Sequence, residues 1–216
     1  MMNDIINFDK QLLVYLNNLG SKTFDGFWLF ITNQFNLAPL FLFIFYLLYK
    51  KIGWRNLLIA LLFIALIIMV CDQTTNLFKY AFQRLRPIND PEIKDSLRII
   101  KTSSSYSFFS GHSSNSMATT VFLFMAFRKH FKFALLLFLF PLIFAYTRIY
   151  LGLHFPTDII TGYSFGILTG LFFYTIYKKY TTEERFASRT TLLITIGAVI
   201  VYFAMCNILV AQLKSI

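Results

Sequence analysis

The segment TRIYLGLHFPTD, residues 147–158, separates two long apolar runs and carries an arginine, a histidine and an aspartate. Two further segments interrupt the apolar sequence upstream: KYAFQRLRP at residues 79–87 and FSGH at residues 109–112. Each of the three lies where an apolar run meets a polar loop. Cations, histidines, an aspartate and a Ser-Gly turn are residue types suited to binding a phosphate and breaking a bond to phosphorus.

The composition indicates an integral membrane protein. Of the 216 residues, 57% are hydrophobic, 27 are phenylalanine and only 14% are charged, which is unusual for a soluble domain. Cys71 and Cys206 both lie inside apolar runs, so we expect free thiols and neither a disulfide nor a metal site. The net charge of +10 fits membrane topology better than nucleic-acid binding, because of where the basic residues lie.

Six apolar runs are long enough, or nearly so, to cross a hydrocarbon core of about 30 Å. They lie near residues 24–49, 56–83, 111–128, 132–151, 158–177 and 190–213. We therefore predict an all-α fold, a polytopic membrane bundle of about six transmembrane helices in a single domain spanning residues 1–216. Its parts are an N-terminal interfacial helix (1–23), the core (24–177), and a cytoplasmic loop with an additional C-terminal span (178–216).

The N-terminal residues predict an amphipathic helix on the membrane surface and no signal peptide. Apolar residues recur there at helical spacing up to Gly20: Ile5, Phe8, Leu12, Tyr15, Leu16 and Leu19. Within the spans, Gly162, Gly166 and Gly170 form a row that favours close helix packing. Pro39 and Pro141 are expected to bend their helices.

Loop charges predict the orientation. Basic residues cluster between spans one and two, three and four, and five and six: Lys50, Lys51, Arg55, Arg128, Lys129, Lys132, Lys178, Lys179, Arg185 and Arg189. The positive-inside rule makes that side cytoplasmic. The three signature segments and both termini then lie outside. In the loop before residue 109, Asp90 and Pro91 predict the start of a short interfacial helix.

The first segment places Lys79 and Arg86 two helical turns apart on one stripe, which ends at Pro87. Asp72 extends that stripe seven residues deeper, where we expect either a supporting role or an interhelical hydrogen bond. Arg84 lies off the stripe and is interpreted as an interfacial arginine.

In the second segment, Ser110, Gly111 and His112 open the third span. Free backbone N–H groups at a helix start bind anions, and glycine permits close approach, although a plain helix cap is the alternative. In the third segment, Asp158 lies four residues after His154 and is suited to fixing its tautomer, unless it only caps the fifth span.

All three segments together resemble the type 2 phosphatidic acid phosphatase superfamily, whose pattern is Lys-x6-Arg-Pro, Pro-Ser-Gly-His and Ser-Arg-x5-His-x3-Asp. The chain matches the first motif fully, but has Phe109 for the proline and Thr147 for the serine. Thr147 keeps a hydroxyl group, so neither substitution argues against activity. The resemblance covers roughly residues 24–177.

The resemblance implies that His154 attacks phosphorus, Asp158 orients it, and His112 protonates the leaving oxygen and then activates water. It also implies a set of phosphate-binding residues: Lys79, Arg86, Arg148, Ser110 and Gly111. Asp72 and Thr147 are placed in supporting positions. No metal or other cofactor is expected, because fixed cations and a helix start can neutralise the phosphate oxygens.

The preferred activity is that of a membrane lipid phosphatase acting on undecaprenyl diphosphate through a phosphohistidine. Alternatives are a lipid A (1- or 4'-) phosphatase, a phosphatidic acid or phosphatidylglycerophosphate phosphatase, a haloperoxidase and, more distantly, a non-catalytic membrane protein. The expected location is the bacterial cytoplasmic membrane with the site facing outward. Expected partners are the bilayer, a lipid phosphate and a second copy in a homo-oligomer, but no nucleic acid.

Overall fold

The computed structural model describes residues 2–129 and 134–181, together with residues 197, 200–201 and 204–205 near the C-terminus. Its α-helices are α1 (Met2–Asn18), α2 (Lys22–Thr32), α3 (Ala38–Phe82), α4 (Gly111–Phe127), α5 (Leu139–Tyr150) and α6 (Pro156–Thr181). Short 3-10 helices are η1 (Gln34–Leu37), η2 (Pro87–Asn89), η3 (Lys94–Ser96) and η4 (Ala134–Phe138). The described ranges contain no strand, which confirms the predicted all-α class.

Two helical stretches, Phe35–Asn89 and Pro156–Tyr180, are long and apolar enough to cross a membrane. The shorter apolar stretch Ala134–Tyr150 lies between them in sequence. The first five predicted runs fall on helical segments of the structure. The sixth, residues 190–213, lies largely outside the described residues, as does Cys206; Cys71 is a buried free thiol, as expected.

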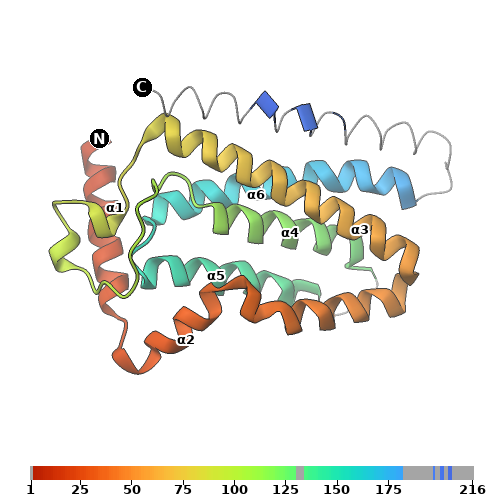
Figure 1. Cartoon of the computed structure of the whole chain (residues 1–216), viewed down its shortest axis with the longest axis horizontal. Helices are drawn as coiled ribbons and strands as arrows, with labels where there is room; N and C mark the ends of the chain where they lie inside the picture. The colour runs from red at the N-terminus through yellow and green to blue at the C-terminus, as the bar shows by residue number, and fades with distance from the viewer. Residues whose placement is uncertain (1, 130–133, 182–196, 198–199, 202–203, 206–216) are drawn as a thin grey trace.

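Helix α3 doubles back at Gly53, so it forms two limbs, residues 38–52 and 54–82 (Figure 1). Gly53 has φ 75°, a conformation that glycine adopts without the steric cost paid by other residues. Lys50 and Lys51 lie at the end of the first limb and Arg55 at the start of the second, on either side of this bend. The first two predicted spans therefore separate where the sequence placed their boundary, but a tight helical bend at Gly53 takes the place of the expected loop.

The two prolines do not kink helix interiors, contrary to the prediction. Pro39 is in the first turn of α3, and the first predicted span is instead broken at Asn33, whose side chain accepts a hydrogen bond from the Phe35 N–H (3.1 Å). Pro141 is in the first turn of α5, directly after η4. Proline is tolerated in a first turn because the N–H it lacks has no intrahelical partner there.

The three glycines of α6 face α4, and the two helices run side by side in the same direction (Figure 1). A Cβ at Gly162, Gly166 or Gly170 would lie 2.7, 2.7 and 2.6 Å from backbone oxygens of α4. The predicted close packing along this row is therefore confirmed. Because lipid is as apolar as the helix surfaces, such contacts depend on tight van der Waals packing.

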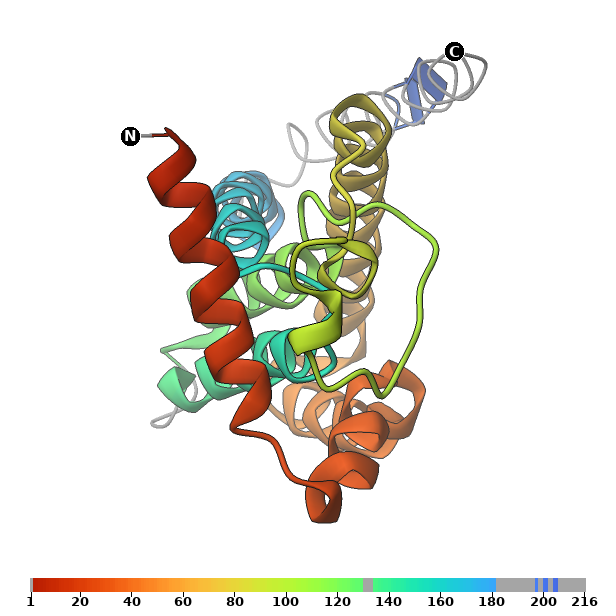
Figure 2. The same ribbon diagram turned by 90° about the vertical axis from the view of Figure 1, so that its left-hand side faces the viewer.

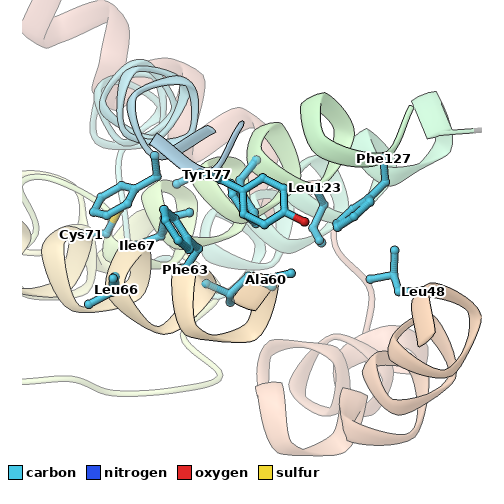
Figure 3. Packing of buried hydrophobic residues seen from close by; sticks show 13 residues of the cluster. Leu48, Ala60, Phe63, Leu66, Ile67, Cys71, Leu123, Phe127 and Tyr177 are labelled. Carbon is cyan, nitrogen blue, oxygen red and sulfur yellow. The ribbon is translucent and has the colours of Figure 1, made fainter. Parts of the chain in front are cut away.

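The main apolar core lies between α3, α4 and α6, toward the end of the bundle that carries the α3 bend (Figure 3). Phe63 stacks on Phe122 with ring centroids 6.0 Å apart, and the Tyr177 ring meets both edge-on. The opposite end of the bundle, where α4 and α6 begin and α5 ends, carries the polar segments.

Helix α1 lies across that polar end and crosses the common direction of α3 to α6 (Figures 1 and 2). It turns the polar residues Asp9 and Asn17 inward, where they are buried together with Leu13, whereas Phe8 and Tyr15 are exposed. The Asn17 amide donates to the carbonyls of Tyr150 (2.8 Å) and Ile149 (3.2 Å) at the C-terminus of α5, where carbonyls lack the usual helical partners. The predicted amphipathic helix is present, with its apolar face pointing away from the bundle.

The segment between α3 and α4 contains η2 and η3 and no α-helix, so the short helix predicted after Asp90 is absent. The Asp90 carboxylate accepts a hydrogen bond from the Glu92 N–H (3.0 Å), a local turn that competes with helix formation. Lys10 of α1 forms ion pairs with Asp90 (2.9 Å) and Glu92 (2.8 Å). The loop is thereby tied to α1.

Candidate active site

The three signature segments meet at the end of the bundle covered by α1 (Figure 2). The first contains the last turn of α3 and the residues after it, the second forms the N-terminus of α4, and the third joins α5 to α6. A backbone hydrogen bond from the Ser110 N–H to the Asp158 carbonyl (3.1 Å) links the second segment to the third. The basic bend of α3 and the C-termini of α4 and α6 lie at the opposite end, as predicted.

Arg86 joins the first segment to His154. The Arg86 Nη1 donates to the Leu153 carbonyl (2.9 Å) and lies 3.2 Å from His154 Nε2. Its Nε and Nη2 donate to Ser105 O and Oγ, each at 2.8 Å. The guanidinium is buried and therefore held beside the imidazole nitrogen that faces the site.

The His154 ring is oriented from its other nitrogen, because Nδ1 lies 3.5 Å from Asp158 Oδ2. An arginine can only donate, so Nε2 beside Arg86 must carry the lone pair, and the proton is assigned to Nδ1 on the Asp158 side. This is the tautomer that leaves Nε2 free to act as a nucleophile. His154 and Asp158 are fully enclosed, with 1% and 0% exposure.

Asp158 lies in the first turn of α6 and not at its N-cap, which was one of the two sequence interpretations. Its Oδ2 accepts from the Phe155 N–H (2.9 Å) and from the Ser107 hydroxyl. The Ser107 hydroxyl also lies 3.5 Å from His154 Nδ1. The carboxylate is thereby fixed by several donors at a helix N-terminus, where negative charge is favoured.

Arg84 is part of this site and is not the interfacial residue expected from sequence. Its Nη1 donates to Asp158 Oδ1 (2.7 Å), and its Nη2 donates to Asp9 Oδ2 of α1 (2.7 Å). Its guanidinium also stacks 3.9 Å above the Phe155 ring. Helix α3 ends at Gln83, which has φ 47°, so the chain reverses direction and turns Arg84 inward.

Ser110 is the N-cap of α4, and its hydroxyl oxygen accepts from the Ser113 N–H (3.3 Å). Gly111 follows where α4 touches α3: a Cβ there would lie 3.3 Å from Thr75 Cγ2. His112 stacks on the Phe144 ring of α5, with centroids 5.4 Å apart. The structure confirms the helix-cap interpretation of Ser110, and anion binding by the N–H groups of this helix start stays a prediction.

Arg148 of α5 is buried and donates through Nη1 to the Thr32 hydroxyl (2.5 Å) at the end of α2. Its Nε has no hydrogen-bond partner among the described residues. A buried N–H without an acceptor costs folding free energy. A phosphate oxygen bound beside Arg148 could accept this hydrogen bond and remove that cost. Thr147 donates to the Phe144 carbonyl (2.6 Å) and contacts Thr32, so it supports Arg148.

Lys79 lies in the last turn of α3, in electrostatic range of Arg86 and Arg148. Asp72, two turns deeper, is exposed and accepts a hydrogen bond from the Asn115 amide of α4 (2.7 Å). Of the two sequence interpretations of Asp72, the geometry fits the interhelical hydrogen bond.

The site carries surplus positive charge. Arg84 is paired with two carboxylates, whereas Lys79, Arg86 and Arg148 form no ion pair in the described part of the chain. Burial, followed by the charges of Arg86, Arg148 and Lys79, lowers the pKa of His154 well below its usual range. The imidazole is therefore neutral and able to attack, and the pocket is suited to a phosphate dianion.

No group of three or more His, Cys, Asp or Glu side chains arranged to hold a metal occurs in the described residues. The residues that the sequence interpretation missed are Ser107, Thr32, Asp9 and the inward role of Arg84. None of them occupies a fixed spacing that would have marked it. Their roles come from turns and from α1, which only the fold brings near the site.

The bundle has two stretches long and apolar enough to cross a membrane, and its cationic, histidine-containing end is suited to phosphate chemistry, a combination that fits a membrane phosphatase. Residues 56–182 match the PAP2 superfamily, and the chain belongs to that family. It is therefore an integral membrane protein and a phosphate-ester hydrolase that acts on lipids.

Two relatives are similar over most of their length. A lipid A 4'-phosphatase of Bacteroides thetaiotaomicron is 34% identical over 188 residues, covering 85% of this chain and 83% of the relative. A lipid A 4'-phosphatase of Porphyromonas gingivalis is 31% identical over 180 residues, covering 82% and 75%. The fold is similar to the crystal structure of a transmembrane PAP2 type phosphatidylglycerolphosphate phosphatase from Bacillus subtilis, with TM-score 0.63, 22% identity, and coverage of 85% and 90%.

Proposed function

We propose that the protein removes the 4'-phosphate from lipid A, acting as a lipid A 4'-phosphatase. The observation that carries this proposal is the 34% identity to a protein of that name across 85% of the chain. The preference for undecaprenyl diphosphate from sequence is not supported by the relatives, which favour the lipid A alternative.

In the first step, His154 Nε2 attacks phosphorus in line with the leaving oxygen. A P–N bond forms and the P–O bond to the sugar breaks, while His112 donates a proton to the departing oxygen. Lys79, Arg86 and Arg148 neutralise the phosphoryl oxygens, and the backbone at Ser110 and Gly111 adds N–H donors. Asp158 holds the His154 proton on Nδ1.

In the second step, water replaces the lipid hydroxyl. His112, now neutral, takes a proton from that water, which attacks phosphorus and breaks the P–N bond. Inorganic phosphate leaves, and His154 returns to its neutral form. Arg86 Nη1 lies 3.2 Å from His154 Nε2, so the same guanidinium can bind the phosphoryl oxygens in both steps.

An apolar cavity of about 520 Å³ supports a lipid substrate. It lies between the first limb of α3, α4 and α5, and its lining includes Leu40, Ile44, Leu123, Phe140, Ile143 and Phe144. Phe144 also stacks on His112, so the cavity begins next to the proposed acid. We propose that it holds an acyl chain while the phosphate occupies the cationic end.

The proposed location is the bacterial cytoplasmic membrane, with the site on its outer face. The basic residues at the α3 bend and at the ends of α4 and α6 support this orientation. The apolar outer face of α1 would then lie in the outer interface.

The test is phosphate release by the purified protein in detergent from five lipids. These are lipid A with both phosphates, lipid A with only the 1-phosphate, phosphatidylglycerophosphate, phosphatidic acid and undecaprenyl diphosphate. We expect release from bisphosphorylated lipid A to leave the 1-phosphate form, which is not itself hydrolysed. A higher kcat/KM on undecaprenyl diphosphate or a glycerophospholipid would contradict the proposal.

Two controls make the assay specific. His154→Gln should release no phosphate from any of the lipids, which excludes a contaminating phosphatase. Each reaction is run with a metal chelator and again with added magnesium. The sequence-based expectation is equal rates, and strong dependence on magnesium would contradict it.

A further inference from the structure

Asp9 is a buried carboxylate on a helix whose other face is turned away from the protein. Its side chain is 3% exposed. Oδ1 accepts from the Thr157 N–H (2.9 Å), and Oδ2 accepts from the Thr157 hydroxyl (2.5 Å) and from Arg84 Nη2 (2.7 Å). Both donor residues lie within the signature segments, Arg84 in the first and Thr157 in the third.

Arg84, which binds Asp9, also binds Asp158. Its Nη1 donates to Asp158 Oδ1 (2.7 Å) and to the Thr157 hydroxyl (2.9 Å), while the Phe155 ring supports the guanidinium plane. One planar cation therefore bridges two buried carboxylates, and its fork geometry fixes both ends at once. A lysine could not hold both.

The Asp9–Arg84 contact joins α1, which lies outside the region that matches the family, to that region. Residues 56–182 match the PAP2 superfamily, whereas Asp9 lies far upstream in α1. Docking of α1 does not depend on Asp9 alone, because Lys10 pairs with Asp90 and Asn17 binds the end of α5. A carboxylate buried against Arg84 therefore calls for an explanation beyond anchoring the helix.

We infer that Asp9 is a positioning residue for catalysis: through Arg84 and Thr157 it holds Asp158, and thereby His154, in the orientation for attack. Helix α1 then helps to position the catalytic residues, in addition to lying at the membrane surface. This inference rests on the proposed roles of His154 and Asp158. It assigns Asp9 no contact with substrate.

The first test is Asp9→Asn, assayed on the best lipid from the substrate panel. Because only the alignment of the nucleophile is disturbed, kcat should fall on the order of ten- to a hundredfold with KM within about twofold. Asp4→Asn, the same change at an exposed position of α1, is the matched control and should keep wild-type kinetics. Thermal unfolding in detergent is measured for both.

The second test asks whether Asp9 acts through Arg84. Once Arg84→Gln has broken the bridge, adding Asp9→Asn should lower kcat much less than it does in the wild type, because only the Thr157 contacts of Asp9 remain to be disturbed. Independent, multiplying losses would overturn the inference. So would a parallel loss of kcat and of unfolding temperature, which would indicate a merely structural role.

If Asp9→Asn does not fold, Thr157→Val removes the hydrogen bonds that the hydroxyl forms with Asp9 and Arg84 while keeping the backbone donor to Asp9. Lowered kcat with unchanged KM supports the inference, and wild-type kinetics overturns it. Failure of the mechanism itself is recognised separately, because His154→Gln would then remain active. An inactive His154→Gln with a fully active Asp9→Asn overturns the role of Asp9 alone.

Discussion

At the scale of single residues, His154 is defined by the groups on its two ring nitrogens. Nε2 meets Arg86 at 3.2 Å, and Nδ1 meets Asp158 at 3.5 Å. The cation beside Nε2 keeps a second proton off that nitrogen, and the carboxylate keeps the first one on Nδ1. The spacing of the motifs predicted the partner at Nδ1, but the contact of Arg86 with Nε2 required the structure.

Removing the cation at Nε2 should change the pH dependence. Burial, Arg86, Arg148 and Lys79 lower the pKa of His154, so the wild-type nucleophile is neutral well below pH ~6.5. In Arg86→Gln the pKa of His154 should rise. The protonated, inactive fraction then grows on the acid side, and kcat/KM falls more at about pH 5.5 than at pH 8.

The measurement is log kcat/KM against pH for both proteins, with Lys94→Gln as the matched control. Lys94 is an exposed cation of the loop before α4, so its loss should leave the profile unchanged. If log kcat/KM of Arg86→Gln falls on the acid side at the same pH as in the wild type, this account of His154 is contradicted.

Ser107 offers a second prediction at this scale. Its buried hydroxyl donates to Asp158 Oδ2, so Ser107→Ala removes one of the donors that fix the carboxylate. We expect kcat to fall about tenfold with little change in KM, because the hydroxyl has no proposed contact with substrate. Steady-state kinetics checks this, and Ser104→Ala at an exposed position is the control. A raised KM at constant kcat would instead mean that Ser107 binds substrate.

At the scale of elements, the glycine row of α6 sets the position of α4. A Cβ at Gly162 would lie 2.7 Å from the Ser110 carbonyl oxygen and 3.1 Å from Ser113 Cβ. This is the turn that opens α4 and presents His112. Helix packing and the placement of the proposed acid therefore share the same contact.

Gly162→Ala should lower both stability and activity. Overpacking of this kind costs about 1–3 kcal/mol, and the displaced Ser110 turn should reduce kcat as well. Gly26→Ala in α2 is the matched control, since nothing lies within 4 Å of a Cβ there. It should be neutral or slightly stabilising. Thermal unfolding in detergent checks both, and equal effects of the two substitutions would contradict the packing argument.

The elements also show where sequence patterns were sufficient and where they were not. Apolar runs predicted the helices and glycine spacing predicted a close helix contact along α6, because both follow from local periodicity, whereas the identity of α4 as the partner came from the structure. The bend at Gly53 and the 3-10 turns after Asp90 were not predicted, because local hydrogen bonds and a single backbone conformation decide them. The break at Asn33 is of the same kind.

At the scale of the whole molecule, the bundle separates two environments. The apolar core lies toward the bend of α3, and the cationic site lies at the end covered by α1. Loop charges predicted that the signature segments lie at the end opposite the basic loops, but the position of the apolar core was not predicted. The inward-facing polar residues of α1 were not predicted, because the sequence pattern identified the helix by its apolar face, and that face points outward.

The apolar cavity provides a prediction that depends on the whole bundle. Leu40→Trp at its wall should raise KM for a long-chain lipid phosphate about tenfold, comparable to losing burial of roughly two methylene groups. A short-chain phosphate monoester that does not reach the cavity should keep its KM. Paired kinetics on the two substrates checks this, and equal changes for both would mean that the cavity does not hold the acyl chain.

The measurement that tests the central claim most directly is trapping of the phosphoryl group on the protein. Purified protein is mixed with a lipid substrate labelled in its phosphate, quenched within one turnover, and the labelled peptide is identified. The account predicts an acid-labile, alkali-stable label on His154, and none in a His154→Gln variant. Label on another residue, or turnover by the His154→Gln protein, would contradict it.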